Sequence, residues 1–252
     1  MGNALSSRTL NGQAAPPKNR KERSFMKRKE LQWWDAAVIS MILFGFAIYN
    51  STMTFLHTNS AVLEQGTVFT SADNWFGIVS ILVELTIAYI YLRLRQFDFS
   101  QWYYKVTWKG TLLAIGLFLL MSVVMDAADV LVYGWAETTA YVGEGGFWVV
   151  LQELDLSLLL FSLLNGAYEE IFFLGVCMVV TQKQRPWVLL YSLLIRFSFH
   201  TYQGIASALE IGFIIGGIYL FFYSRKKDRN LYPFMLSHAF ADIFGAGILT
   251  LL

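Results

Sequence analysis

Long apolar runs, interrupted by single polar residues, dominate the chain from residue 33 to its end. Runs of about 17 to 25 apolar residues can cross a hydrocarbon core of roughly 30 Å as α-helices. Because backbone groups in lipid must be satisfied internally, and no alternating strand pattern recurs, helices are favoured over a β-barrel. We therefore predict an all-α, polytopic membrane bundle of about seven spans: Trp33–Phe55, Trp75–Leu92, Thr111–Tyr133, Leu158–Val180, Trp187–Tyr202, Leu209–Tyr223 and Pro233–Leu252.

The segments between these runs divide the chain into three parts. Residues 1–30 are polar, contain Pro-Pro and hold eight Lys or Arg against two Glu, so we predict a disordered, basic cytoplasmic arm near anionic lipid headgroups. Residues 31–154 supply the N-terminal spans, and residues 155–252 form a second helical part that holds the candidate site. We interpret the segment 147–157, which is rich in polar residues, as an interfacial helix on the outer side, and a re-entrant segment is equally permitted.

Composition and charge support this class and set the orientation. Of 252 residues, 56% are hydrophobic and 15% charged, and the formal net charge is +1, which gives no reason to expect a nucleic-acid partner. Loops 57–74 and 134–146 contain no Lys or Arg, whereas the N-terminal arm and the segments 93–109, 183–185 and 225–229 are basic, so the N-terminus is predicted to be cytoplasmic. We expect a multi-pass protein of the bacterial plasma membrane. Its partners would be the lipid bilayer and a peptide or protein substrate within it.

Five of the ionisable residues inside the last four predicted spans form a candidate site: Glu169, Glu170, His200, His238 and Asp242. A carboxylate at the centre of a membrane helix costs roughly 2.5 to 3.5 kcal/mol, so it is retained mainly when it is paired or functional. Adjacent residues on a helix point about 100° apart, so the two glutamates should have different roles, one as a general base and one held ionised by a cation. Asp242 follows His238 by one turn and can orient its imidazole.

A metal site is an alternative interpretation of these residues. Two histidines and a glutamate, here Glu169, His200 and His238, are a ligand set that zinc accepts with one position open for catalysis. The sequence does not choose between zinc and a metal-free glutamate base.

The order of these motifs resembles a known family. A Glu-Glu pair in one span, a histidine near the end of the next and HxxxD in the last are similar to the CPBP family of intramembrane endopeptidases, the CAAX-protease and bacteriocin-processing proteins, also called the Abi family. The resemblance covers roughly residues 155–250. It implies that Glu169 activates a water, that His200 assists, and that His238 with Asp242 stabilises the oxyanion.

Two positions depart from the family pattern EExxxR and FxxxH. Leu174 stands where the motif has Arg, and Arg196 stands where the motif has Phe. The usual Arg would neutralise the second glutamate at i,i+4, and a lone guanidinium within a span would be costly. We therefore predict that Arg196 supports the site by supplying the missing cation to Glu170. Decay of the enzyme into a binding protein is the alternative.

Other polar residues within or near the spans are interpreted as structural. We expect interhelical hydrogen bonds for Glu84 and Glu210, and water contact for His57 at a span end. Asp126 and Asp129, near the outer end of the third span, would face a polar cavity or cap the helix mouth, and the cap is preferred. One difficulty is depth. If the three helices that carry the candidate catalytic residues were straight and perpendicular to the membrane, these residues would lie at different depths in it and would not meet.

Three functions from different classes remain. An intramembrane endopeptidase that cleaves a membrane-associated, leader-bearing or lipidated peptide is preferred. A non-proteolytic scaffold of the same fold, acting in bacteriocin self-immunity or sensor-kinase regulation, is the alternative that Leu174 favours. A proton-coupled transporter is the weakest, because the halves of the chain show no inverted repeat.

Overall fold

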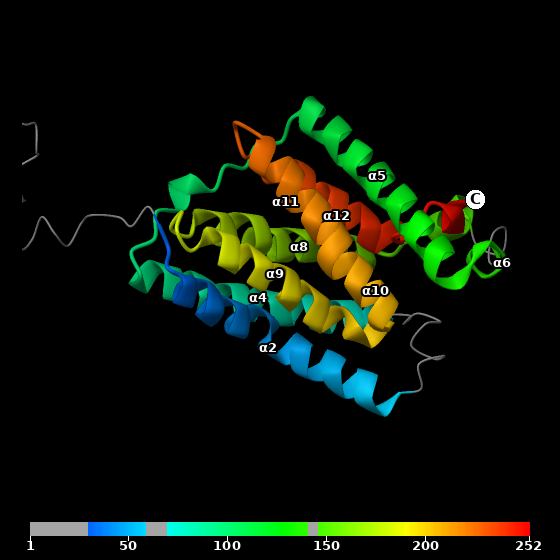
Figure 1. Cartoon of the computed structure of the whole chain (residues 1–252), viewed down its shortest axis with the longest axis horizontal. Helices are drawn as coiled ribbons and strands as arrows, with labels where there is room; N and C mark the ends of the chain where they lie inside the picture. Colours follow the sequence, from blue (N-terminus) through cyan, green and yellow to red (C-terminus); the bar gives the residue numbers. More distant parts are fainter. Residues whose placement is uncertain (1–29, 59–69, 141–145) are drawn as a thin grey trace, which may run out of the picture.

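The computed structural model describes residues 30–58, 70–140 and 146–252, and this part of the chain is helical and without β-strands. The all-α prediction is thus confirmed, while the N-terminal arm lies outside the described residues apart from Glu30. The longer helices, shown in Figure 1, are α2 (Trp33–His57), α4 (Ser71–Leu94), α5 (Trp108–Tyr133), α8 (Leu156–Glu170), α9 (Arg185–His200), α11 (Gly216–Arg225) and α12 (Tyr232–Phe244). The shorter elements are η1 (Phe99–Gln101), α6 (Trp135–Thr138), α7 (Phe147–Glu153), η2 (Ile171–Val176), η3 (Cys177–Val179), η4 (Thr201–Gln203), α10 (Ile205–Leu209), η5 (Glu210–Ile215) and η6 (Leu249–Leu251).

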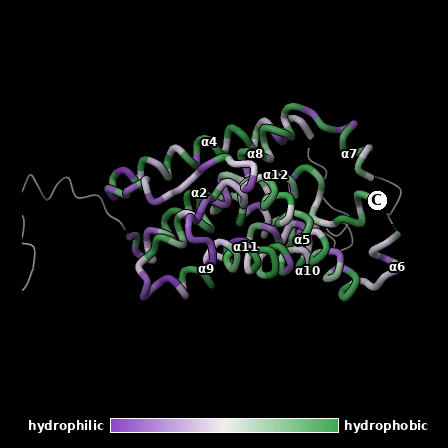
Figure 2. Tube along the Cα trace, turned by 90° about the horizontal axis from the view of Figure 1, so that it is seen from above, coloured by the Kyte–Doolittle hydropathy of each residue, from purple (hydrophilic) through white to green (hydrophobic). Residues whose placement is uncertain are grey.

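Five helical stretches of the described chain are long and apolar enough to cross a membrane: Trp33–His57, Ser71–Leu94, Trp108–Tyr133, Leu156–Val179 and Ile205–Arg225. Figure 2 shows hydrophobic residues along most of the helical trace and hydrophilic residues mainly toward one end. These stretches match five of the seven predicted spans, and the polytopic class is confirmed.

The remaining two predicted spans correspond to shorter helices. α9 has 16 residues and α12 has 13, so α12 is only about 20 Å long at 1.5 Å per residue. The predicted extent of the last span, Pro233–Leu252, is wrong, because α12 ends at Phe244 and Gly245 follows it with a φ of +83°, which does not continue an α-helix. Asp126 of α5 accepts hydrogen bonds from the backbone of Ile248 (2.9 Å) and Leu249 (3.1 Å), which fixes the segment after α12.

A short helix separate from α8 occupies the segment predicted to be interfacial. α7 ends at Glu153, and α8 begins after Asp155, whose carboxylate accepts a hydrogen bond from the backbone of Leu158 at 2.7 Å. An aspartate in this N-cap position satisfies one of the free N–H groups of a helix start. The break is therefore local, whereas the position of α7 relative to a membrane stays a prediction.

Two apolar clusters hold the bundle together. In the first, α2, α4, α8 and α9 pack around aromatic rings, with the rings of Phe44 and Phe199 stacked at 4.8 Å. In the second, α5, η2, α11 and α12 pack around methionine and tyrosine side chains, including Met121, Met235 and Tyr219. α8 packs against both α4 and α12, so the chain segment that carries the glutamate pair lies between the two clusters (Figure 1).

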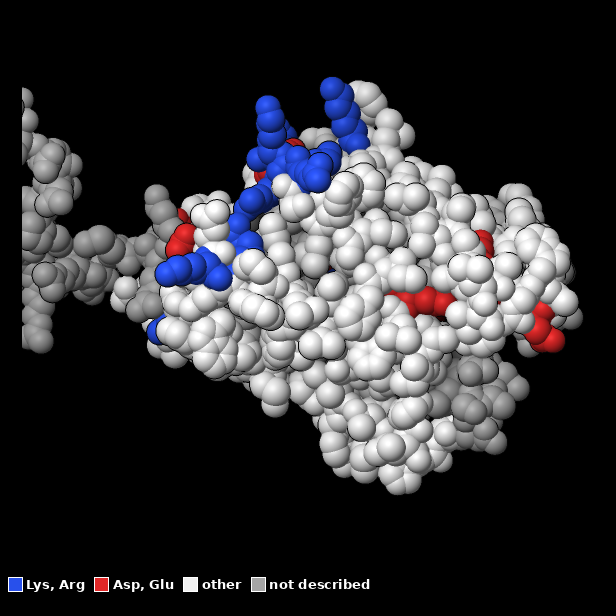
Figure 3. Space-filling model, in the orientation of Figure 1, with Lys and Arg blue, Asp and Glu red and all other residues white. Residues whose placement is uncertain are grey.

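The charged side chains are distributed unevenly. On the face shown in Figure 3, Lys and Arg gather over the end where α11 passes into α12, and Asp and Glu lie mainly toward the opposite end. This clustering agrees with the basic connections that the sequence places on one side. Which side of the membrane this end faces stays a prediction.

Candidate active site

The glutamate pair lies at the end of α8, in the middle of the bundle. The side chains are almost fully buried, with Glu169 4% and Glu170 0% exposed. The chain continues directly into η2, a π-helical turn from Ile171 to Val176. Such turns insert one extra residue per turn into a helix and occur frequently at functional sites. The change of helical geometry therefore begins immediately after the two carboxylates.

Arg196 of α9 contacts Glu170, which is the pairing that the sequence predicts. Its Nη2 lies 2.6 Å from Glu170 Oε1, and the two side chains are 2% and 0% exposed. The guanidinium also lies over the ring of Phe173, 4.1 Å from its centroid, and desolvated contacts of this kind favour the cation. Leu174 is 1% exposed and belongs to the second apolar cluster. A cation from the neighbouring helix thus neutralises Glu170 without a basic residue at 174.

His238 and Asp242 of α12 complete a polar network. His238 Nδ1 lies 2.9 Å from Glu170 Oε1, while its Nε2 lies 3.8 Å from Glu169 Oε1 and 3.6 Å from Asp242 Oδ1. Since the latter two separations exceed hydrogen-bond length, Nε2 faces two carboxylates without a direct bond to either. The structure therefore brings together Glu169, Glu170, Arg196, His238 and Asp242.

A glycine makes this approach possible. A Cβ atom at Gly166 would lie 2.5 Å from the carbonyl oxygen of Met235 and 3.3 Å from His238 Cβ. Only a residue without a side chain therefore allows the backbone of α12 to cross α8 so closely, one turn before the glutamates. The close crossing brings His238 beside both carboxylates, so the depth difference expected for straight, perpendicular helices does not keep these residues apart.

Two further glycines allow α9 to pack closely against the segment that contains residues 212–216. Cβ atoms at Gly212 and Gly216 would lie 2.8 Å from Phe197 Cα and 2.8 Å from Leu193 Cδ2, respectively. Small residues four apart allow membrane helices to approach closely. This contact holds the segment of α9 that contains Arg196. The sequence analysis did not use the glycines, although the GxxxG spacing of residues 212–216 was visible in it.

His200 lies one turn after Arg196 and is held by the backbone. Its Nδ1 is 2.7 Å from the carbonyl oxygen of Arg196, and the residue is 9% exposed. A carbonyl only accepts hydrogen bonds, so Nδ1 carries the proton and Nε2 of the neutral ring is an acceptor. Within the described residues, no hydrogen bond or ion pair joins His200 to the carboxylates of the site.

Asn165 is a polar contact that sequence reasoning missed. Its Nδ2 donates to Glu169 Oε1 at 3.3 Å and to Asp242 Oδ2 at 3.0 Å. The i,i+4 spacing from Glu169 was the available signal. The second oxygens of Glu169 and Glu170 are buried, and among the described residues they have no hydrogen-bond partner. Buried acceptors of this kind are normally satisfied, so each has an unused lone pair that a further donor such as water would satisfy.

The predicted zinc ligands are not the residues that the structure groups. Ligand atoms of Glu169, Glu170 and His238 lie within 4.8 Å of one another, whereas His200 is not part of this group. The set fits a zinc ion poorly, because Glu170 Oε1 already accepts from Arg196 and contacts His238. A second cation would lie beside a permanent guanidinium charge, and repulsion in a low-dielectric interior is strong. We therefore derive no reaction step through a metal.

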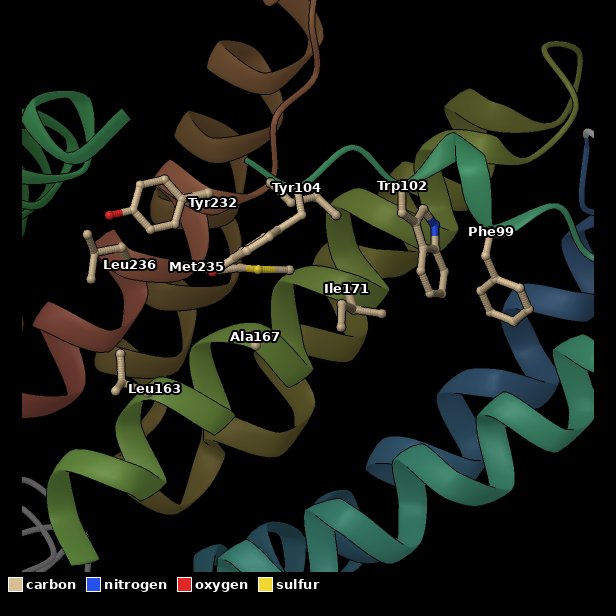
Figure 4. Close-up of a pocket in the computed structure, with 10 residues that line it drawn as sticks. Phe99, Trp102, Tyr104, Leu163, Ala167, Ile171, Tyr232, Met235 and Leu236 are labelled. Carbon is tan, nitrogen blue, oxygen red and sulfur yellow. The ribbon is translucent and has the colours of Figure 1, made fainter. Parts of the chain in front are cut away.

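An apolar groove runs beside the site. It has a volume of about 570 Å³ and lies between α8, α12 and the loop that contains η1. Figure 4 shows Leu163 and Ala167 of α8 and Ile171 of η2 along one side, with Met235 of α12 opposite and Trp102 at one end. Ala167 follows Gly166, and Met235 precedes His238 by three residues, so the groove is lined by the same two helices that carry most of the polar network.

The other ionisable residues in the spans have separate surroundings. Glu84 accepts a hydrogen bond from the hydroxyl of Tyr168 at 2.7 Å, and His57 Nδ1 lies 2.9 Å from the carbonyl of Met53, in line with structural roles. The hydrogen bond expected for Glu210 is wrong, because neither carboxylate oxygen has a partner among the described residues. Its 4% exposure leaves it buried at the first residue of η5.

Comparison with known proteins relates the C-terminal part of the chain to a family. Residues 151–244 match the family model described as type II CAAX prenyl endopeptidase Rce1-like. This match agrees with the resemblance of the C-terminal part to the CPBP family. The matched segment contains the six polar residues singled out from the sequence, from Glu169 to Asp242. Searches of curated proteins and of solved structures found no match.

Proposed function

We propose that this chain is an intramembrane endopeptidase that hydrolyses a peptide bond with a water activated by Glu169. One observation carries the proposal. Glu169 has a buried oxygen without a partner, beside a histidine whose Nε2 lies 3.8 Å from the other oxygen. A general base must present a free lone pair where water can sit within hydrogen-bond reach. Glu170 is less suited to this role, because Arg196 and His238 both occupy its Oε1.

The reaction follows from these positions. Glu169 takes a proton from water as the water oxygen adds to the carbonyl carbon of the scissile bond, and the carbonyl electrons move to its oxygen. The N–H of His238 would stabilise this oxyanion, since a donor fixed in a water-poor site contributes strongly. Collapse then restores the carbonyl and breaks the C–N bond, while Glu169 returns the proton to the leaving nitrogen. His200 Nε2, an acceptor in the neutral ring, would orient the water.

The groove supports a membrane-associated substrate. Its lining is predominantly apolar and comes in part from α8 and α12, which also carry Glu169 and His238, so it can hold the apolar part of a lipidated or leader-bearing peptide. The scissile bond would then extend past Met235 toward His238. The domain match supports a CAAX-protease-like activity, and the substrate itself is part of the proposal.

The test compares wild type with Glu169→Ala, His200→Ala and His238→Ala in cells lacking their own copy, at matched membrane abundance. Mass spectrometry of released peptides is the readout. Glu210→Gln is a matched control, because Glu210 is a buried intramembrane carboxylate outside the site. We expect the three site variants to lose one processed peptide that the control retains. If all variants keep the same peptides, the non-proteolytic scaffold interpretation replaces the peptidase.

A further inference from the structure

The glutamate base and Asp242 form a contact between like charges on different helices. Glu169 is on α8 and Asp242 on α12, and both approach His238 Nε2, at 3.8 and 3.6 Å. These separations are too long for a hydrogen bond, so His238 alone does not fix either carboxylate. Two carboxylates that share a site repel each other, and without a shared donor they would move apart.

Asn165 is the group that hydrogen-bonds to both. A side-chain amide has two N–H donors, and Asn165 Nδ2 donates to Glu169 Oε1 at 3.3 Å and to Asp242 Oδ2 at 3.0 Å. The amide is neutral, so it joins the two acids without removing the negative charge that the base needs. The bond to Oε1 also leaves Glu169 Oε2 as the oxygen without a partner.

We propose that Asn165 is a positioning residue of the site, which joins Glu169 to Asp242 and directs Glu169 Oε2 toward the catalytic water. This inference rests on the proposed peptidase function and assigns Asn165 no contact with substrate. Gly166 brings the two helices together, and Asn165 then sets the orientation of the base within that contact.

The test uses purified full-length protein in liposomes, with a peptide that the wild type is shown to cleave. Asn165→Asp keeps the shape of the side chain and removes both donors, and Asn165→Leu removes them without adding charge. We expect kcat to fall about 100-fold with KM nearly unchanged, because misplacement of a reacting group by about 1 Å has an effect of this size. Asn165→Gln, which keeps the amide on a longer side chain, should recover part of kcat.

Asn74→Leu is the matched control. Asn74 is a buried asparagine of α4 that donates to Ser157 of α8 at 3.2 Å. Its loss therefore removes an amide hydrogen bond between two helices that also involves α8 but lies away from the site. It should leave kcat unchanged.

The outcomes separate the two proposals. If wild-type protein cleaves peptide and Asn165→Leu has the wild-type kcat, the positioning role is wrong and the peptidase stands. A rise in KM without loss of kcat in both Asn165→Asp and Asn165→Leu would also overturn the positioning role. If wild type cleaves none of the peptides that its presence alters in cells, the peptidase proposal itself fails.

Discussion

Two arginine–carboxylate pairs in this molecule, each with a fully buried carboxylate, differ in how completely that carboxylate is satisfied. Near the start of α2, Asp35 is 0% exposed and accepts from Arg95 Nε at 2.6 Å, Arg95 Nη2 at 3.2 Å, the Tyr91 hydroxyl at 2.7 Å and the Gln32 backbone at 2.9 Å. Each oxygen therefore has two donors. This pair joins α2 to the end of α4.

The pair of Glu170 and Arg196 is equally short but unsaturated. One oxygen of Glu170 receives both Arg196 and His238, and the other has no partner among the described residues, as is true of Glu169 Oε2. A structural ion pair gains by satisfying every lone pair, because each unmade hydrogen bond is costly when buried. Free buried oxygens beside a histidine are therefore what distinguish a chemical site from a structural contact.

The largest expected effect comes from breaking the pair inside the site. Arg196→Leu leaves Glu170 as an uncompensated buried charge, and loss of one partner of a buried pair typically costs about 3 to 5 kcal/mol. We expect a markedly lower thermal unfolding midpoint in detergent and loss of peptide processing. Adding Leu174→Arg should restore part of both, because Leu174 shares an apolar cluster with Tyr219, which lies 5.7 Å from the Arg196 guanidinium. Unchanged stability and activity in Arg196→Leu would show that the pair is not needed.

His238, the second partner of Glu170, can be displaced by a substitution that changes no charged residue. Gly166→Ala places a Cβ 2.5 Å from the Met235 carbonyl, so α12 must shift away from α8. Overpacking of this kind costs about 1 to 3 kcal/mol. Peptide processing should fall by more than the loss of stability explains, because His238 moves with α12. The unfolding midpoint measures that loss of stability. Gly116→Ala, where a Cβ meets no atom within 4 Å, is the matched control and should be neutral. Equal behaviour of the two variants would contradict the close-crossing argument.

Breaking the structural pair should separate stability from chemistry. In Arg95→Leu, Asp35 keeps its bonds from Tyr91 and Gln32, and the Arg95 side chain is 25% exposed, so water can replace part of it. We expect a loss of about 1 to 2 kcal/mol in unfolding free energy. Processing per folded molecule should equal wild type, measured against membrane abundance. A selective loss of activity would mean that the α2–α4 contact also shapes the site.

The smallest effect is expected from metal removal. Because Arg196 already neutralises Glu170, chelation with a strong zinc ligand should leave both the unfolding midpoint and the rate of peptide processing unchanged. Carbonic anhydrase treated in parallel would show that the chelator is active, since its zinc is required for catalysis. Loss of activity that added zinc restores would overturn the metal-free mechanism and favour a ligand set of Glu169, Glu170 and His238.

The length and hydropathy of the apolar runs determined much about this protein without coordinates. They gave the helical membrane class and the location of the long spans, because a segment in lipid must satisfy its own backbone. The order of Glu169–Glu170, His200 and His238–Asp242 gave the resemblance of the C-terminal part to the CPBP family, and the match of residues 151–244 agrees with it. The sequence also predicted that Arg196 pairs with Glu170. Leu174 stands where the motif has its Arg, and an unpaired guanidinium in a span, such as that of Arg196, is costly.

Tertiary structure decided how the polar residues meet. Periodicity fixes only which residues share a face of one helix, whereas the crossing of α12 over α8 depends on the space left at Gly166. That contact decided that His238 reaches both glutamates and that Asn165 joins Glu169 to Asp242. The last helix ends at Phe244, and Asp126 of α5 binds the backbone of the segment that follows. Distances between helices depend on packing of side chains from distant segments, and no local pattern encodes them.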